Sequence, residues 1–198
     1  MLTVSGISSL VIDNLCDEPC EEENAIAMFY CDFRDQHDQT ATNIIGAILK
    51  QLVVRGEVLE HVRKAFQKAK MEVGGRGLRL ADMVQMLRQA LARLPRVFIC
   101  IDALDECIPK HLLELLGSLR DIIQESPRTR IFLTGRPQVE DEITRHFTNC
   151  ATISISPKTQ DVRRYLEKKL EMDPQRVAMS DSLRADIMRI IPERISEM

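Results

Sequence analysis

The sequence has no long hydrophobic run, no secretory signal and no excess of basic residues. No stretch of about 18 apolar residues occurs, so we expect no transmembrane helix. The N-terminus lacks the basic region, apolar core and cleavage site of a secretory signal. Lysine and arginine number 27 against 30 aspartates and glutamates, a net charge of −3. No global positive field would attract nucleic acid or an anionic membrane, and we expect neither as a partner.

The cysteines lack the pattern of a disulfide framework or a zinc site. Six are scattered along the chain, and Cys31, Cys100 and Cys150 lie in or beside apolar runs. This is typical of reduced thiols in an intracellular protein. Cys16 and Cys20 are four residues apart, but no second pair of cysteine or histidine residues has zinc-like spacing. We therefore predict a cytoplasmic protein without a structural zinc ion.

The segment 96–107 reads R-V-F-I-C-I-D-A-L-D-E-C and combines an apolar run with a cluster of acids. Residues 97–101 are typical of a strand buried on both faces of a parallel sheet. The acids Asp102, Asp105 and Glu106 follow at once. Ligands of open α/β folds bind at the carboxyl ends of the strands, where these acids lie. The pattern therefore indicates a site for Mg²⁺ and water beside a nucleotide phosphate, although a solvated loop after a core strand is the alternative.

Strand-like segments alternate with helical ones along the chain. Segments 25–33 and 130–134 resemble buried strands, and 151–155 a weaker edge strand. This alternation predicts an α/β fold with a doubly wound, mostly parallel sheet and right-handed crossovers. Apolar residues at helical spacing predict helices over 1–15, 40–55, 57–70, 80–94, 112–123, 139–147, 158–170 and 182–191.

A second polar cluster, Thr134-Gly135-Arg136-Pro137, follows the strand 130–134. Parallel strands end at the same edge, so the carboxylate of Asp102, which can hold a metal, and the guanidinium of Arg136, which can bind phosphate, are expected to face one crevice. The alternative for Arg136 is a helix-capping or surface arginine. The alternative for Thr134 is a strand-end residue whose hydroxyl satisfies the backbone.

Other patterns in the sequence carry no predicted chemistry. A glycine-rich phosphate loop needs a preceding strand and a following Gly-Lys-Ser/Thr, and the glycines at 74, 75 and 77 have neither, so we interpret them as a linker. The four histidines are isolated on polar stretches. Cys107 directly follows two acids and would form a poor thiolate.

Three segments resemble one family. F-I-C-I-D-A-L-D-E-C resembles the Walker B segment of NACHT NTPases, in the STAND class of signalling P-loop proteins, and I-F-L-T-G-R-P resembles their sensor 1 strand. Residues 29–53 are similar to the strand and helix between Walker A and Walker B in fungal NACHT proteins. The nearest resemblance is to the nephrocystin-3-like NACHT segment of fungal NLR-like proteins. It implies a P-loop NTPase-like fold.

The resemblance also implies roles for individual residues. Asp102 would coordinate Mg²⁺ bound with ATP or GTP. Glu106 or Asp105 would orient the water that attacks the γ-phosphate, and the alternatives are equally supported. Arg136 would sense that phosphate, and Thr134 would add a hydroxyl contact to the nucleotide.

One departure from the family bears on function. Family members carry G-x-x-x-x-G-K-Ser/Thr before the first helix, and this chain contains no Gly-Lys-Ser/Thr. We therefore expect a NACHT-like core without its P-loop over residues 1–157 and a helical segment over 158–198 that leads toward a winged-helix region, in a chain truncated at both ends. The implied function is a nucleotide-dependent signalling switch that hydrolyses ATP or GTP and oligomerises with other NACHT domains. The alternative is a non-catalytic interaction scaffold that has lost nucleotide binding.

Overall fold

The computed structural model contains two compact units, Leu2–Cys150 and Ala151–Met198. The first unit contains the sheet and the second contains two helices, α7 (Thr159–Glu171) and α8 (Asp181–Ser196). The functional identities expected for the parts 1–157 and 158–198 stay predictions. The structure describes residues 4–17, 24–54, 64, 78–155, 158–172 and 179–196.

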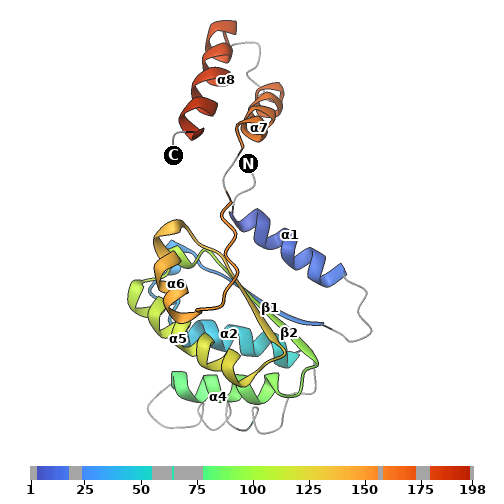
Figure 1. The fold of residues 1–198 in the computed structure, drawn as a ribbon, viewed down its shortest axis with the longest axis vertical. Helices are drawn as coiled ribbons and strands as arrows, with labels where there is room; N and C mark the ends of the chain where they lie inside the picture. Colours follow the sequence, from blue (N-terminus) through green and yellow to red (C-terminus); the bar gives the residue numbers. More distant parts are fainter. Residues whose placement is uncertain are drawn as a thin grey trace. The chain divides into compact units, whose positions relative to one another are not determined.

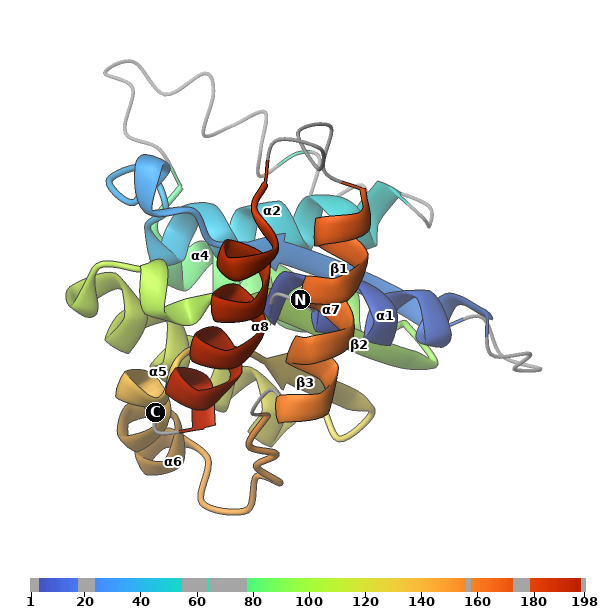
Figure 2. The same cartoon turned by 90° about the horizontal axis from the view of Figure 1, so that it is seen from above.

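Three parallel strands, β1 (Asn24–Tyr30), β2 (Arg96–Asp102) and β3 (Thr129–Leu133), lie in the order β1-β2-β3 (Figure 2). Tyr30 lies opposite Asp102, and Ile101 lies opposite Leu133. The three strands therefore end together, and the polar residues that follow them meet at one edge of the sheet.

Helices cover both faces of this sheet. Because the strands follow one another in order, right-handed crossovers place the connecting helices α2 (Ala41–Val54), α4 (Leu80–Leu91) and α5 (Pro109–Glu125) on the same face. Helix α1 (Val4–Asp17), which precedes β1, covers the opposite face (Figure 1). The predicted fold class, an α/β fold with a doubly wound parallel sheet, is confirmed. Shorter elements are the 3-10 helices η1 (Phe33–Asp35), η2 (Leu104–Glu106) and η3 (Pro137–Val139) and the helix α6 (Glu140–His146).

The central strand β2 is apolar on both faces, as its sequence predicts. Val97, Ile99 and Ile101 belong to the larger core cluster with residues of α2, α4 and α5. Cys100 belongs to a smaller cluster with Ile12 of α1. Side chains alternate along a strand, so the next residue on the α1 face after Cys100 is the one that ends the strand, Asp102.

The side of β1 that faces away from β2 is covered at Met28 by a side chain of α2. The amide of Gln51 accepts a hydrogen bond from Met28 N–H at 3.0 Å and donates one to Met28 C=O at 2.7 Å. Both outward backbone groups of Met28 are thus satisfied, which reduces the tendency of an edge strand to pair with another chain.

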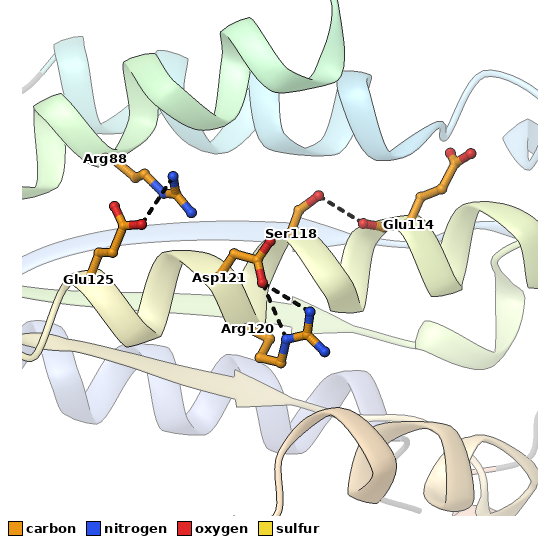
Figure 3. Close-up of polar contacts among 6 residues, drawn as sticks. All are labelled: Arg88, Glu114, Ser118, Arg120, Asp121 and Glu125. Atoms are coloured by element: carbon orange, nitrogen blue, oxygen red, sulfur yellow. Dashed lines mark hydrogen bonds and ion pairs between the residues drawn. The ribbon is translucent and has the colours of Figure 1, made fainter.

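Polar contacts on α4 and α5 add little to the packing of these helices. Arg88 of α4 and Glu125 of α5 form an ion pair, Nη1 to Oε1, at 3.3 Å. Both side chains are partly exposed, and such pairs contribute about 1 kcal/mol or less. Figure 3 shows this pair with two contacts within α5, Arg120 to Asp121 and Ser118 to the carbonyl of Glu114. Apolar burial therefore holds α4 and α5 against each other and the sheet.

Two predicted strands differ in the structure. The strand expected over 25–33 ends at Tyr30, because the carboxylate of Asp32 accepts a hydrogen bond from Arg34 N–H and caps η1. The edge strand expected over 151–155 is wrong. In the described residues the sheet extends only from β1 to β3, so this segment has no partner strand, and Ile153 and Ile155 are 80% and 62% exposed.

The predicted helices largely agree with the structure. The last helix extends beyond the expected 182–191, since α8 continues through Pro192 to Ser196. The hydroxyl of Ser180, directly before α8, accepts a hydrogen bond from Leu183 N–H at 3.2 Å. Except for residue 64, the expected helix 57–70 lies outside the described residues, as do the glycines of the expected linker. Within the described ranges, no helix is both long and apolar enough to cross a membrane.

Two leucines of α5 test the packing of this helix. Leu115 is fully buried, whereas Leu113 is 45% exposed. Leu115→Ala should lower the free energy of unfolding by about 2–5 kcal/mol because it leaves a cavity in the core. Leu113→Ala, the matched control, should change it by about 0.5 kcal/mol or less. Urea unfolding followed by circular dichroism measures both; equal losses would contradict this packing.

Candidate functional site

Backbone hydrogen bonds tie the strand ends together beyond the regular sheet. Thr134 N–H donates to Ile101 C=O at 3.0 Å, and Leu104 N–H donates to Thr134 C=O at 2.9 Å. On the other side of β2, Cys31 N–H donates to Asp102 C=O at 3.0 Å. The turns after all three strands are therefore held in fixed positions around the end of β2.

Asp102 is a buried carboxylate, 2% exposed, at the end of β2. Its Oδ1 accepts hydrogen bonds from the hydroxyl of Ser8 on α1 and from the hydroxyl of Thr134, the latter at 2.5 Å. Its Oδ2 is also buried, yet it has no hydrogen-bond partner among the residues that the structure describes. An unpaired buried oxygen on a charged group is costly. A cation or hydrogen-bond donor bound at this atom would offset that cost.

The two hydroxyls that contact Asp102 come from elements far apart in the sequence, Ser8 from α1 and Thr134 from the turn after β3. Thr134 has a second role, because its Oγ1 accepts a hydrogen bond from Ala103 N–H at 3.1 Å. The alternative for Thr134, a strand-end residue whose hydroxyl satisfies the backbone, therefore agrees with the structure, and its contact with a nucleotide stays a prediction. Ser8 was missed by the sequence analysis. Its signal was a polar residue four positions before Ile12, on the apolar stripe of a predicted helix.

The backbone conformation of Ala103 explains why a small residue follows Asp102. Its backbone has φ 57° and ψ 49°, in the left-handed region, and among the described residues it is the one non-glycine position with positive φ. A β-branched side chain would be strongly disfavoured there. This turn leads the chain from β2 directly into η2, which carries Asp105 and Glu106.

Asp105 and Arg136 are in direct contact. Arg136 donates from its backbone N–H to Asp105 Oδ1 at 3.0 Å, and its Nε lies 3.3 Å from Oδ2. The Asp105 side chain is 8% exposed and that of Arg136 is 68% exposed. The side chain of Arg136 makes no capping hydrogen bond to η3. The carboxylate thus anchors a guanidinium that is otherwise largely open to solvent.

Glu106 contacts the turn after β1. Its Oε2 accepts a hydrogen bond from Phe33 N–H at 2.7 Å. Both oxygens of Asp105 are engaged by Arg136, whereas one hydrogen bond to Oε2 leaves Oε1 of Glu106 without a partner in the described part of the chain. The two adjacent acids are therefore not equivalent.

Two thiols meet beside these acids, which the sequence analysis did not foresee. The Sγ atoms of Cys31 and Cys107 lie 3.2 Å apart, and both residues are buried. The hydrogen bond between the thiols raises the pKa of Cys31 and lowers that of Cys107. The expectation that two neighbouring acids make Cys107 a poor thiolate overlooked this partner, which lies 76 positions away in the chain.

The described residues contain no group of three or more histidine, cysteine, aspartate or glutamate side chains that could hold a metal ion. Mg²⁺ does not need such a group, since it is commonly bound by one or two carboxylates together with phosphate oxygens and water. The unpaired Oδ2 of Asp102 fits that requirement.

Comparison with protein families gives one assignment. The family model described as "Nephrocystin 3, N-terminal" matches residues 5–136, about two thirds of the 198-residue chain. This chain belongs to the nephrocystin 3 N-terminal family. The matched range includes Asp102, Asp105, Glu106, Thr134 and Arg136. The predicted resemblance to the nephrocystin 3 segment is confirmed; the finer NACHT and STAND assignments stay predictions.

Other comparisons add little to this family assignment. A solved structure, that of the Aeropyrum pernix ORC1 protein in complex with DNA, resembles the chain with 19% identity and a TM-score of 0.44. The match covers 87% of this chain and 46% of that one, so this chain spans less than half of the ORC1 chain. Comparison with curated proteins gives no significant match.

Gly135 lies where a side chain would collide with the core. A Cβ there would approach Cγ2 of Val139, which is buried, to 2.7 Å, whereas a Cβ at Gly117 in α5 would have nothing within 4 Å. Gly135→Ala should lower the free energy of unfolding by about 1–3 kcal/mol. Gly117→Ala should raise it by about 0.5–1 kcal/mol, since alanine favours a helix interior. Chemical denaturation measures both; a neutral Gly135→Ala would contradict the observed turn.

The hydroxyl of Thr134 gives a second test. Thr134→Val removes one donor to Asp102 and leaves Ala103 N–H unpaired, so it should lower the free energy of unfolding by about 1–3 kcal/mol. Thr134→Ser keeps the hydroxyl and should lose about 1 kcal/mol or less, for one methyl group. Equal losses in the two variants, measured by denaturant unfolding, would show that the hydroxyl has no such role.

Proposed function

We propose that this chain is the nucleotide-binding core of a NACHT-type signalling switch, in which the strand-end site binds Mg²⁺ and the phosphates of ATP or GTP. The observation that carries the proposal is the buried Oδ2 of Asp102, which lacks a hydrogen-bond partner within the described ranges while Oδ1 accepts two hydrogen bonds. A carboxylate held in this way by hydroxyls, with one oxygen left over, is suited to coordinate a cation directly or through water.

Asp102 would hold Mg²⁺, and the ion would supply neutralisation of charge on the phosphate oxygens. The hydroxyls of Ser8 and Thr134 orient the carboxylate. Because they donate to Oδ1, Oδ2 would be the oxygen that coordinates the cation. Ser8 and Thr134 are therefore positioning residues for this carboxylate.

Arg136 would bind the terminal phosphate. Its contact with Asp105 uses the backbone N–H and Nε, and a guanidinium has further N–H donors in a planar arrangement that matches phosphate oxygens. Asp105 would act as the residue that positions Arg136.

Glu106 would orient the attacking water. Its Oε2 is held by Phe33 N–H, which fixes the side chain, and its Oε1 is left for water. Of the two acids that the sequence left equivalent, we therefore assign this role to Glu106. The proposal also includes slow hydrolysis of the nucleotide and selection between two conformations by the bound nucleotide. It further includes oligomerisation with related domains and a cytoplasmic location.

The second candidate function is a non-catalytic scaffold. The chain contains no Gly-Lys-Ser/Thr, so its residues do not supply the lysine and backbone cradle that hold the phosphates in P-loop proteins. Such a module would keep the fold and associate with related domains without nucleotide. The experiment below separates the two functions.

Titration calorimetry of Mg²⁺-ATP and Mg²⁺-GTP into the 198-residue chain tests nucleotide binding. We expect a dissociation constant below about 1 mM for at least one nucleotide. Asp102→Asn should weaken binding by about tenfold or more, because one carboxylate charge toward the metal is lost. The matched control is Asp121→Asn, which changes a surface carboxylate of α5 that contacts Arg120 and should leave the affinity unchanged.

No detectable binding by a chain with a folded circular dichroism spectrum would overturn the proposal and favour the scaffold. Equal affinities of the Asp102→Asn and Asp121→Asn variants would overturn the role of Asp102. Omitting Mg²⁺ should weaken binding to the original chain more than binding to Asp102→Asn, because the variant has already lost its metal ligand.

A further inference from the structure

Cys31 and Cys107 form a pair of facing thiols at the strand ends. Cys31 directly follows β1, and Cys107 directly follows η2. Their Sγ atoms lie 3.2 Å apart, on the face of the sheet that packs against α2, α4 and α5. Neither thiol has a role in the proposed binding of a nucleotide.

The backbone holds both cysteines in place. Cys31 N–H donates to Asp102 C=O at 3.0 Å, and Cys107 N–H donates to Leu104 C=O at 3.1 Å. The hydrogen bond from Phe33 N–H to Glu106 joins the same two segments. The approach of the sulfur atoms is thus set by the fold of the strand ends rather than by free rotation of exposed side chains.

We propose that Cys31 and Cys107 are a reversible thiol oxidation site at which a peroxide produces an intramolecular disulfide. In the first step one thiolate attacks the peroxide O–O bond, forming a sulfenic acid and releasing water from hydrogen peroxide. In the second step the other thiol attacks that sulfur, the S–S bond forms and the hydroxyl leaves as a second water. Two thiols and one peroxide thus yield one disulfide and two waters.

The geometry requires little movement. A disulfide has an S–S distance of about 2.05 Å, so the Sγ atoms must approach by about 1.2 Å from their separation of 3.2 Å. Rotation of side chains whose backbones are already hydrogen-bonded to the same loop can supply this shift. Each cysteine is 7% exposed, so we expect a small peroxide to reach the pair more readily than a bulky oxidant does.

The other described cysteines do not share this arrangement. Cys100 lies on the opposite face of the sheet, in the cluster with Ile12 of α1. Cys16 and Cys150 are exposed. Cys100 therefore serves as the matched control. It is a buried strand thiol in the smaller core cluster, away from Cys31 and Cys107, which belong to the larger one.

The disulfide would connect the end of β1 to the loop that carries Asp105 and Glu106. It would restrict movement of that loop, and any effect on nucleotide affinity rests on the proposed function. Formation of the disulfide itself does not depend on nucleotide, so the two proposals are tested separately.

The experiment treats the folded 198-residue chain with hydrogen peroxide, blocks the remaining thiols with iodoacetamide under denaturing conditions and identifies disulfides by mass spectrometry. Digestion after aspartate and glutamate places each of the six cysteines on a different peptide. We expect a linked pair that contains Cys31 and Cys107, with loss of both free thiols, and its disappearance after dithiothreitol. Recovery of these two cysteines as separate alkylated peptides, or linked to other cysteines, would overturn the proposal.

Variants provide a second measurement. The disulfide of the original chain should raise Tm by several degrees over the reduced form, since it restricts the unfolded chain. Peroxide should still raise the Tm of Cys100→Ser but not that of Cys107→Ser. Equal peroxide-induced shifts in these two variants would overturn the assignment. If Cys107→Ser does not fold, the peptide analysis of the original chain decides alone.

Discussion

A carboxylate buried at the end of a parallel strand needs hydrogen-bond donors, and those of Asp102 come from two elements that are far apart in the sequence. The hydroxyl of Ser8 reaches it from α1, and that of Thr134 reaches it from the turn after β3. Both contacts require that α1 docks on the sheet and that β2 pairs with β3. Because a charge buried without partners is costly, the burial of Asp102 depends on this packing. The carboxylate thus connects the integrity of the fold to the chemistry of the site.

The register of the sheet makes this arrangement possible. The strands end together, so three turns with different side chains surround the end of β2. On the α1 face lies the carboxylate of Asp102, and on the opposite face lie the thiols of Cys31 and Cys107. Asp105, anchored to Arg136, and Glu106, anchored to Phe33, extend from the loop between these faces. The end of β2 therefore has the carboxylate of Asp102 on one face of the sheet and the pair of thiols on the other.

Membership of the nephrocystin 3 N-terminal family agrees with this picture, because the matched residues include α1 from residue 5 onward, the three strands and the turns around Asp102. Ser8 near the start of the match and Thr134 near its end meet at one carboxylate. The interval thus contains both of the hydroxyl donors that orient Asp102. Helices α7 and α8 of the second unit follow the matched interval in the sequence.

The sequence by itself determined the three strands, most helices and the parallel α/β fold, because buried parallel strands are continuous apolar runs and helices repeat every 3.6 residues. It also indicated Asp102, Asp105, Glu106, Thr134 and Arg136 as neighbours, since parallel strands end at one edge. It did not reveal Ser8, the Cys31–Cys107 pair or the different contacts of Asp105 and Glu106, and it wrongly indicated a strand over 151–155. Only the tertiary structure decided these, because packing and register determine which distant residues become partners, and a local sequence pattern does not name the partner.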